Sequence, residues 1–183
     1  GWCDPGVAMT AVIQLGSIAA VIAYFRADLA KVGRGISRAL RQGQWDHPDA
    51  RLGMAIAVGT LPIVIAGLAV KLFWPGYETS WLRSVQSIGV VSIVMALLLA
   101  LAEQLGQRRK QLPTVQGRDG LIVGLAQMLA IIPGVSRSGS TLTASLLAGW
   151  QRSDAARFSF LLGIPAITLA GLDPALSGLK IVT

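Results

Sequence analysis

The sequence has few of the residues that build a disulfide framework or a metal centre. Among its 183 residues there is one cysteine, Cys3, and one histidine, His47. A single cysteine excludes an intrachain disulfide, and Cys3 has no neighbouring ligands for a metal ion. His47 stands in polar sequence beside Asp46 and close to Asp49, a setting typical of a solvated loop residue. The sequence therefore identifies no metal-ligating residue.

Charge is also scarce. Charged residues make up 14% of the chain and hydrophobic residues 53%, and the hydrophobic residues occur in long blocks. This composition is typical of an integral membrane protein. It predicts an all-α helical bundle in which residues 1–183 form a single transmembrane domain. The predicted spans are residues 7–25, 52–73, 85–102 and 158–179, the last interrupted at Pro165 and at Asp173-Pro174.

The net charge of +7 is concentrated in two short polar segments. Residues 26–51 and residues 103–119 are basic, whereas residues 74–84 are nearly neutral. Short cytoplasmic loops carry such an excess of Lys and Arg, so both basic segments are predicted to be loops on the cytoplasmic side. Clustering between apolar blocks argues against nucleic acid as a partner. Trp150, at the end of an apolar block, is expected at the membrane interface.

Residues 133–141 (PGVSRSGST) place an arginine and four hydroxyls inside apolar sequence. An arginine at membrane depth is costly, so Arg137 should face a partner, a cavity or a ligand. A kinked helix with a buried Arg–acid pair is the bland alternative, but residues 120–151 contain no acidic residue. Pro133 and Gly134 break the helix there and free backbone N–H groups. A fixed cation, hydroxyls and open amides together suit a phosphate group.

The apolar stretch before this break is too short to cross a membrane. Residues 120–132 would form a helix of about 20 Å, whereas the hydrocarbon layer is about 30 Å thick. The sequence after the hairpin is basic again, with Arg152 and Arg157. Both observations predict a re-entrant broken-helix hairpin over residues 120–150 that returns to the cytoplasmic side. Irregular backbone at that depth must line a cavity or be buried in protein, so residues 133–139 are predicted to form the site wall.

Two familiar phosphate-site motifs do not fit. Gly134 and Gly139-Ser140-Thr141 have nearly the spacing of a P-loop, but the lysine is absent and the preceding segment is not a strand. A lipid phosphatase of the acid-phosphatase type would need a histidine soon after Ser136-Arg137, and none follows.

Four motifs resemble the undecaprenyl-diphosphate phosphatase family, the bacitracin-resistance membrane phosphatases. They are residues 12–18 (VIQLGSI), 124–130 (GLAQMLA), 133–141 (PGVSRSGST) and 158–165 (FSFLLGIP). They occur in the family's order and cover almost the whole chain. The resemblance implies an inverted-repeat membrane fold of which this chain forms half. It also implies hydrolysis of a polyprenyl diphosphate at the outer face of the bacterial plasma membrane. That reaction recycles the carrier lipid for peptidoglycan synthesis and confers bacitracin resistance.

The resemblance also assigns roles to residues. Arg137 is expected to clamp the diphosphate, while Ser136 and Thr141 bond its oxygens or shape the hairpin. Gln127 and Gln14 are expected either to support the site or to form helix–helix hydrogen bonds. Further expected substrate-binding residues are Gly134, Ser138, Gly139 and Ser140. A homodimer is a further expectation.

The chain also departs from the family. Family members carry a first hairpin, with a Glu-rich helix and a Ser-Ser-Thr-Gly-His loop, ahead of the segment that begins here near Val7. Its absence predicts a fragment that is inactive alone, because phosphoryl transfer needs groups that position the nucleophile and neutralise charge. The resemblance implies a divalent metal, Mg²⁺ or Ca²⁺, for which the chain shows no ligands. A transporter or flippase for an anionic lipid or anion is the main alternative, and a purely structural membrane protein the third.

Overall fold

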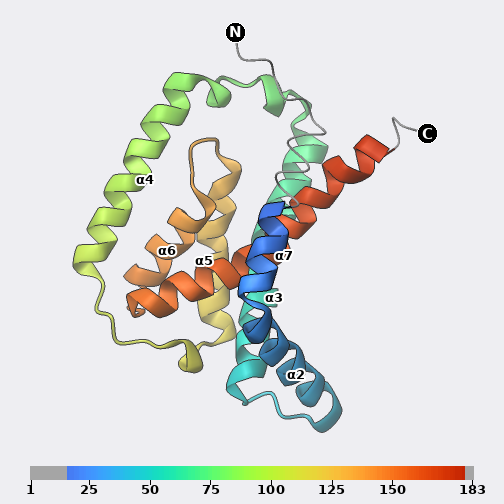
Figure 1. The fold of residues 1–183 in the computed structure, drawn as a ribbon. Coiled ribbons are helices and arrows are strands. Elements are labelled where there is room, and N and C mark those ends of the chain that lie inside the picture. Colours follow the sequence, from blue (N-terminus) through green and yellow to red (C-terminus); the bar gives the residue numbers. More distant parts are fainter. Residues whose placement is uncertain (1–15, 180–183) are drawn as a thin grey trace.

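The computed structural model describes residues 16–179, without the side chains of Glu78 and of residues 170–179. Over these residues the regular structure is helical apart from one isolated bridge, which confirms the predicted all-α class. A helical segment over residues 16–24 leads into the first labelled helix (Figure 1). The long helices are α2 (Arg26–Gln42), α3 (Pro48–Phe73), α4 (Val85–Leu105), α5 (Gly117–Met128), α6 (Arg137–Leu147) and α7 (Arg152–Leu179). Short 3-10 turns lie at Pro75–Thr79, Trp81–Arg83, Leu112–Thr114 and Leu129–Ile131.

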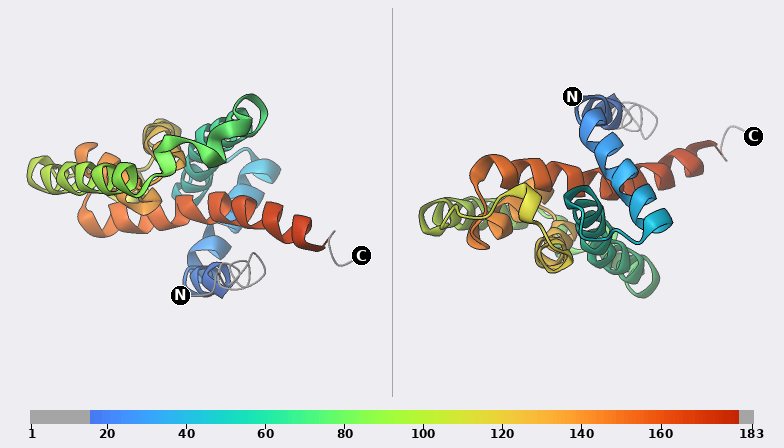
Figure 2. Two further views of the ribbon diagram at one scale, coloured as in Figure 1. Left: turned by 90° about the horizontal axis from the view of Figure 1, so that it is seen from above. Right: turned by 90° about the horizontal axis from the view of Figure 1, so that it is seen from below.

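Two helices in the described part are long and apolar enough to cross a membrane. They are α3 and α4, with mean hydropathies of 2.2 and 2.4, and they coincide with the predicted spans 52–73 and 85–102. Residues 7–15 of the predicted span 7–25 lie outside the described residues, as do the side chains that end span 158–179. Helix α7 runs through Pro165 and Pro174 without the interruptions expected there. In both views of Figure 2 it extends from beside α4 to the far side of the molecule.

The expectation of a loop over residues 26–51 was wrong, because Arg26–Gln42 forms helix α2. Val32, Gly35 and Ala39 are buried along one side of α2, which packs against α3. A Cβ atom on Gly35 would lie 2.6 Å from the Cβ of Asp49, so the two segments approach closely there. The mean polarity of the segment suggested a loop, whereas the three- and four-residue spacing of its apolar positions is that of an amphipathic helix.

Glycines let α5 pack directly on α3. Gly120 and Gly124 are four residues apart on α5, facing Ala55 and Gly59 on α3. A Cβ atom on Gly120 would lie 2.1 Å from the Ala55 carbonyl oxygen, and one on Gly124 would lie 2.2 Å from that of Gly59. Small residues at this spacing are the usual means of close helix approach in membranes. The contact fixes the orientation of α5, and therefore of the hairpin that it begins.

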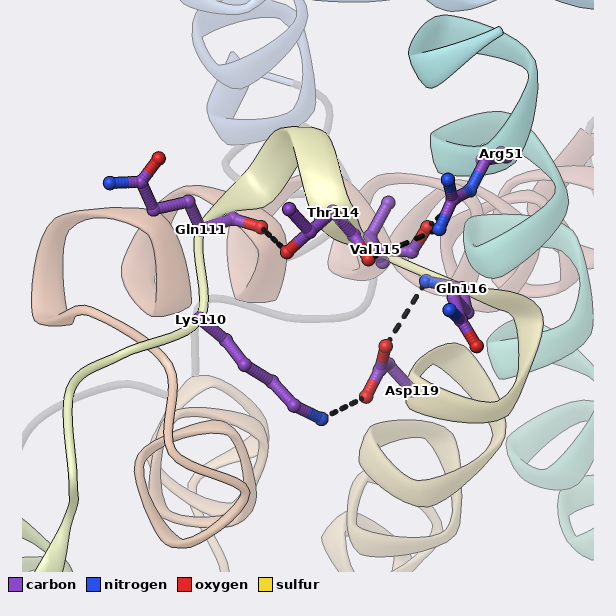
Figure 3. Close-up of polar contacts among 7 residues, drawn as sticks. All are labelled: Arg51, Lys110, Gln111, Thr114, Val115, Gln116 and Asp119. Carbon is purple, nitrogen blue, oxygen red and sulfur yellow. Dashed lines mark hydrogen bonds and ion pairs between the residues drawn. The ribbon is translucent and has the colours of Figure 1, made fainter. Parts of the chain in front are cut away.

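The two ends of the predicted hairpin attach to the same basic segment. The Lys110 amide donates to the Gly149 carbonyl and the Gln151 amide to the Lys110 carbonyl, each at 2.8 Å. On the α5 side, the Lys110 ammonium pairs with Asp119 at 2.8 Å (Figure 3). The Arg51 guanidinium of α3 bonds the Val115 carbonyl at 3.0 Å in the same region. Figure 1 shows the α5–α6 connection at the opposite end of the hairpin, toward the end where α3 finishes.

Trp150 belongs to the core rather than to an interfacial surface. Its side chain is fully buried and stacks on Phe158, with ring centroids 5.1 Å apart. The expectation of an interfacial tryptophan at this position was wrong. The bonds of Gly149 and Gln151 to Lys110 hold the tight turn into α7 against the preceding segment, and this turn directs the indole inward.

Candidate active site at the broken helix

The helix break lies where the sequence predicts it. Helix α5 tightens into the 3-10 turn Leu129–Ile131, and α6 begins at Arg137. Between them, Pro133 lacks a backbone N–H and cannot continue a helix. Gly134 has a φ of 96°, and a Cβ atom there would lie 2.7 Å from the Ile88 carbonyl oxygen. Both its backbone conformation and its surroundings therefore require glycine.

Two side chains from outside the hairpin hold this break. The Tyr77 hydroxyl donates a hydrogen bond to the Ile131 carbonyl, and the Ser92 hydroxyl of α4 donates to the Gly134 carbonyl at 3.1 Å. A break in a helix leaves carbonyls without intrahelical partners, and buried carbonyls need replacements. Neither Tyr77 nor Ser92 was expected from the sequence, since neither carries a signal of this role in its local sequence.

The start of α6 presents its N-terminus and two hydroxyls. Ser136 is the N-cap, and its side-chain oxygen accepts a hydrogen bond from the Gly139 amide at 3.2 Å. Ser136 and Ser138 are exposed, with side-chain oxygens 3.4 Å apart. A Cβ atom on Gly139 would lie 3.1 Å from the Cβ of Ser136, so the cap is tightly packed. A helix N-terminus favours anions through its free amides and its dipole.

Ser140 and Thr141 lie on the other side of this turn. Their side chains are 2% and 0% exposed, and both hydroxyls donate to the Arg137 carbonyl, at 2.9 and 3.0 Å. Of the two roles expected for Thr141, the structure favours shaping the hairpin over bonding a phosphate oxygen. Thr141 lies one turn after Arg137, on the buried face of α6.

Arg137 lines a groove of about 610 Å³ between α3, α6, α7 and the turn Leu129–Ile131. Its Nε atom is buried and has no hydrogen-bond partner among the described residues. Apart from Arg137 and one lysine, the side chains that line the groove are apolar, including Val64, Leu68 and Leu169. No described acidic side chain lines it. A kinked helix with a buried Arg–acid pair, the structural alternative, is thus not found in the described part of the chain.

The lysine is Lys71, a residue that the sequence analysis missed. It lies in the last turn of α3, within the predicted span 52–73, and lines the same groove as Arg137. The signal was available, since an ionisable residue in an apolar block is a functional candidate in its own right. A lysine near the end of a span, next to Trp74, is however also explained by a side chain that reaches toward the membrane interface.

Of the two glutamines expected to support the site, the structure describes Gln127 but not Gln14. Gln127 is fully buried, and both atoms of its amide group lack hydrogen-bond partners among the described residues. It is not part of the groove lining, so the structure does not bring it to Arg137. Gln14 lies outside the described residues.

The described side chains do not fit a metal ion. Among the side chains that the structure describes, there is no group of three or more His, Cys, Asp or Glu residues that could hold one. The groove instead presents apolar walls and the guanidinium of Arg137, the first residue of α6. This arrangement suits an anion attached to an apolar chain.

Comparison with known families shows which family the chain belongs to. The family model described as bacitracin resistance protein BacA matches residues 1–182. The chain belongs to the bacitracin resistance protein BacA family. It is an all-α integral membrane protein, as the sequence predicted, and the resemblance stated from its motifs is confirmed.

Close relatives within the BacA family carry the name undecaprenyl-diphosphatase. The relative from Synechococcus sp. (strain RCC307) is 84% identical over 172 residues, covering 94% of this chain and 60% of the relative. The one from Parasynechococcus marenigrum (strain WH8102) is 77% identical, covering 93% of this chain and 60% of the relative. The one from Prochlorococcus marinus (strain MIT 9303) is 73% identical, covering 94% and 59%. The chain thus spans about three fifths of the length of these relatives.

Proposed function

We propose that the protein hydrolyses undecaprenyl diphosphate to undecaprenyl phosphate and inorganic phosphate. The oxygen of a water molecule bonds to the terminal phosphorus, the anhydride P–O bond breaks, and the lipid leaves as its monophosphate. The observation that carries the proposal is Arg137, whose buried Nε lacks a described partner at the wall of an apolar groove. The names of the relatives support it.

The groove and the start of α6 divide the binding of such a lipid between them. The Arg137 guanidinium can grip two phosphate oxygens at once and stabilise charge that develops on them. Ser136 and Ser138 offer hydroxyl donors beside it at the positive end of α6. The apolar walls from α3 and α7 suit the isoprenoid chain.

The described side chains do not supply every group that the reaction needs. Attack by water requires a proton acceptor, and no described carboxylate or imidazole lines the groove. We propose that the proton acceptor, and the ligands of a divalent Mg²⁺ or Ca²⁺ ion, come from protein that the described residues do not include. The described residues by themselves do not fit that ion.

We place the protein in the bacterial plasma membrane as a multi-pass protein, with the groove open toward the outer face. The basic segments join helices at one end of the molecule, and the hairpin tip lies toward the other (Figure 1). There the reaction would recycle the carrier lipid for peptidoglycan synthesis and confer bacitracin resistance. Assembly as a homodimer is part of the proposal.

Cysteine labelling tests this topology. In a Cys3→Ser background, Gln107→Cys and Ser153→Cys are expected to react with a membrane-impermeant maleimide from the cytoplasmic side only. The reason is that Lys110 joins both ends of the hairpin to one segment, through its backbone bonds with Gly149 and Gln151 and through the pair of its ammonium group with Asp119. Thr79→Cys, an exposed position in the opposite loop, serves as the control and is expected to react from the outside. Labelling of Gln107→Cys and Ser153→Cys from opposite faces would contradict the re-entrant hairpin.

A transport assay separates hydrolysis from the main alternative. A broken helix whose N-terminus faces an anion is also the device of several transporters. The protein at the full length of its relatives is reconstituted in vesicles of bacterial phospholipid. It is expected to release inorganic phosphate from undecaprenyl diphosphate at a rate proportional to the amount of protein. If the lipid instead crosses the bilayer with its diphosphate intact, the protein is a flippase and the proposed function is wrong.

A further inference from the structure

Helix α2 carries a row of basic side chains on a face that does not pack against the protein. Its 17 residues include five basic residues and one acidic residue. Four of the basic residues, which we call the basic stripe, follow one another at intervals of three, four and three positions: Lys31, Arg34, Arg38 and Arg41. This spacing places them on one face of a helix. All four are exposed, whereas the buried residues Val32, Gly35 and Ala39 lie on another side of α2.

The described part of the protein does not neutralise the basic stripe. Asp28, the one acidic residue of α2, pairs with Arg157 of α7. The Nε atom of Arg34 donates to the Ala30 carbonyl of its own helix at 3.2 Å, a bond that leaves the charge of the guanidinium uncompensated. Among the described side chains, no residue of the stripe forms an ion pair. The stripe therefore presents four uncompensated positive charges on one surface.

The contact of α2 with α3 places the stripe beside the end of a membrane span. The 26 residues of α3 form a helix of about 39 Å, which is longer than the hydrocarbon layer of about 30 Å. Helix α2 packs on the first turns of α3: a Cβ atom on Gly35 would lie 2.6 Å from the Cβ of Asp49, and one on Gly53 would lie 2.7 Å from the Cδ1 of Ile36. These turns carry Asp49 and Arg51, so they belong to the polar layer of the membrane. Figure 1 shows α2 at this end of the molecule, opposite the α5–α6 connection.

Two exposed apolar side chains lie at the end of α2. Leu40, in the last turn of the helix, is 70% exposed, and Trp45 is 43% exposed. Gly43, with a φ of 68°, ends the helix between them. Indole rings prefer the interface between lipid and water, and helices at this interface combine apolar side chains with a basic face. The pair therefore favours a lipid surface over a soluble acidic partner for the stripe.

We propose that the basic stripe of α2 binds the headgroups of anionic phospholipids at the membrane surface that α2 borders. Their negative charge complements the stripe, and each Lys or Arg near such a surface adds to the attraction. Because α2 packs on the first turns of α3, this binding fastens the start of the span to one membrane surface. Such binding is independent of the proposed hydrolysis.

Quenching by labelled lipids tests this surface. In a background without other cysteines, Gln42→Cys at the exposed end of α2 is labelled with bimane. The protein at the full length of its relatives is then reconstituted in phosphatidylcholine vesicles that contain the same low fraction of doxyl-labelled phosphatidylglycerol or doxyl-labelled phosphatidylcholine. Phosphatidylglycerol is expected to quench about fivefold more strongly at low salt, the size of one basic contact with an anionic surface, and the excess should shrink at high salt. Both leaflets have the same composition, so the direction of insertion does not affect the result.

Two matched double variants show where the preference arises. Arg34→Gln with Arg38→Gln removes two charges from the stripe and should bring quenching by the two lipids within about twofold of each other. Arg109→Gln with Arg118→Gln removes two exposed charges from the other basic segment and should leave the fivefold difference unchanged. Glutamine favours a helix, so circular dichroism should not change.

Equal quenching by the two lipids before any arginine is replaced would overturn the inference and leave a soluble acidic partner as the occupant of the stripe. Equal loss of the preference in both double variants would also overturn it, because net charge rather than the stripe would then attract the lipid.

Discussion

Replacing Arg137 by lysine is expected to lower phosphate release by about a hundredfold or more, as removal of one preorganised transition-state donor does in other enzymes. Lysine keeps the positive charge but loses the planar fork that grips two phosphate oxygens. The buried Nε of Arg137, without a described partner, is one of the donors that lysine cannot replace. Initial rates of phosphate release by purified full-length protein measure the effect.

Two further variants make the result specific. Arg137→Met removes the charge as well and should be no more active than Arg137→Lys. Arg38→Lys makes the same chemical change at an exposed position on α2 and should leave the rate unchanged. Near-normal turnover by Arg137→Lys would show that only bulk positive charge matters and would contradict the role given to the guanidinium.

The 183-residue chain alone is expected to release no measurable phosphate from undecaprenyl diphosphate, whereas a longer chimera should do so. The chimera joins this chain to the part of the Synechococcus relative that it does not match, since it covers 60% of that protein. The chain offers groups that are proposed to hold phosphate, but no described carboxylate or imidazole lines the groove to accept a proton. Binding that stabilises ground and transition states equally gives no acceleration. The difference should be about a hundredfold or more, the usual contribution of a positioned acid or base.

The chimera carries its own control. Chimera with Arg137→Met should lose activity, which would show that its phosphate release uses the groove of this chain. Each protein is assayed with added Mg²⁺ or Ca²⁺ and with a chelator. Metal-dependent release of phosphate by the 183-residue chain itself would overturn the proposal that the proton acceptor and the metal ligands come from protein outside the described residues. Binding of the diphosphate by the chain alone is compatible with it, because Arg137 and the α6 N-terminus are present.

Local sequence determined the class of protein and the place of the site. Apolar blocks predict membrane helices because the hydrocarbon layer requires about 20 apolar residues per span. Pro133 and Gly134 mark the break because proline lacks a donor and glycine alone tolerates the backbone there. Arg137 stands out because a charged side chain in apolar membrane sequence is costly and usually has a functional role. Each of these signals lies within one stretch of chain.

Tertiary structure alone decided which of the marked hydroxyls are exposed and which residues line the groove with Arg137. Ser136 and Ser138 are exposed while Ser140 and Thr141 are buried, a division that depends on how α6 is rotated against its neighbours. Lys71 joins Arg137 although 66 positions separate them in the sequence.

The support of the break is likewise a matter of packing. The Ser92 bond to Gly134 joins residues 42 positions apart, and the glycine contacts between α3 and α5 fix the angle at which the hairpin stands. Hydrogen bonds and steric contacts between distant segments depend on side-chain direction and helix spacing. Only packing sets these, so the sequence singled out Arg137, and the fold supplied the groove that it lines and the supports of the helix break.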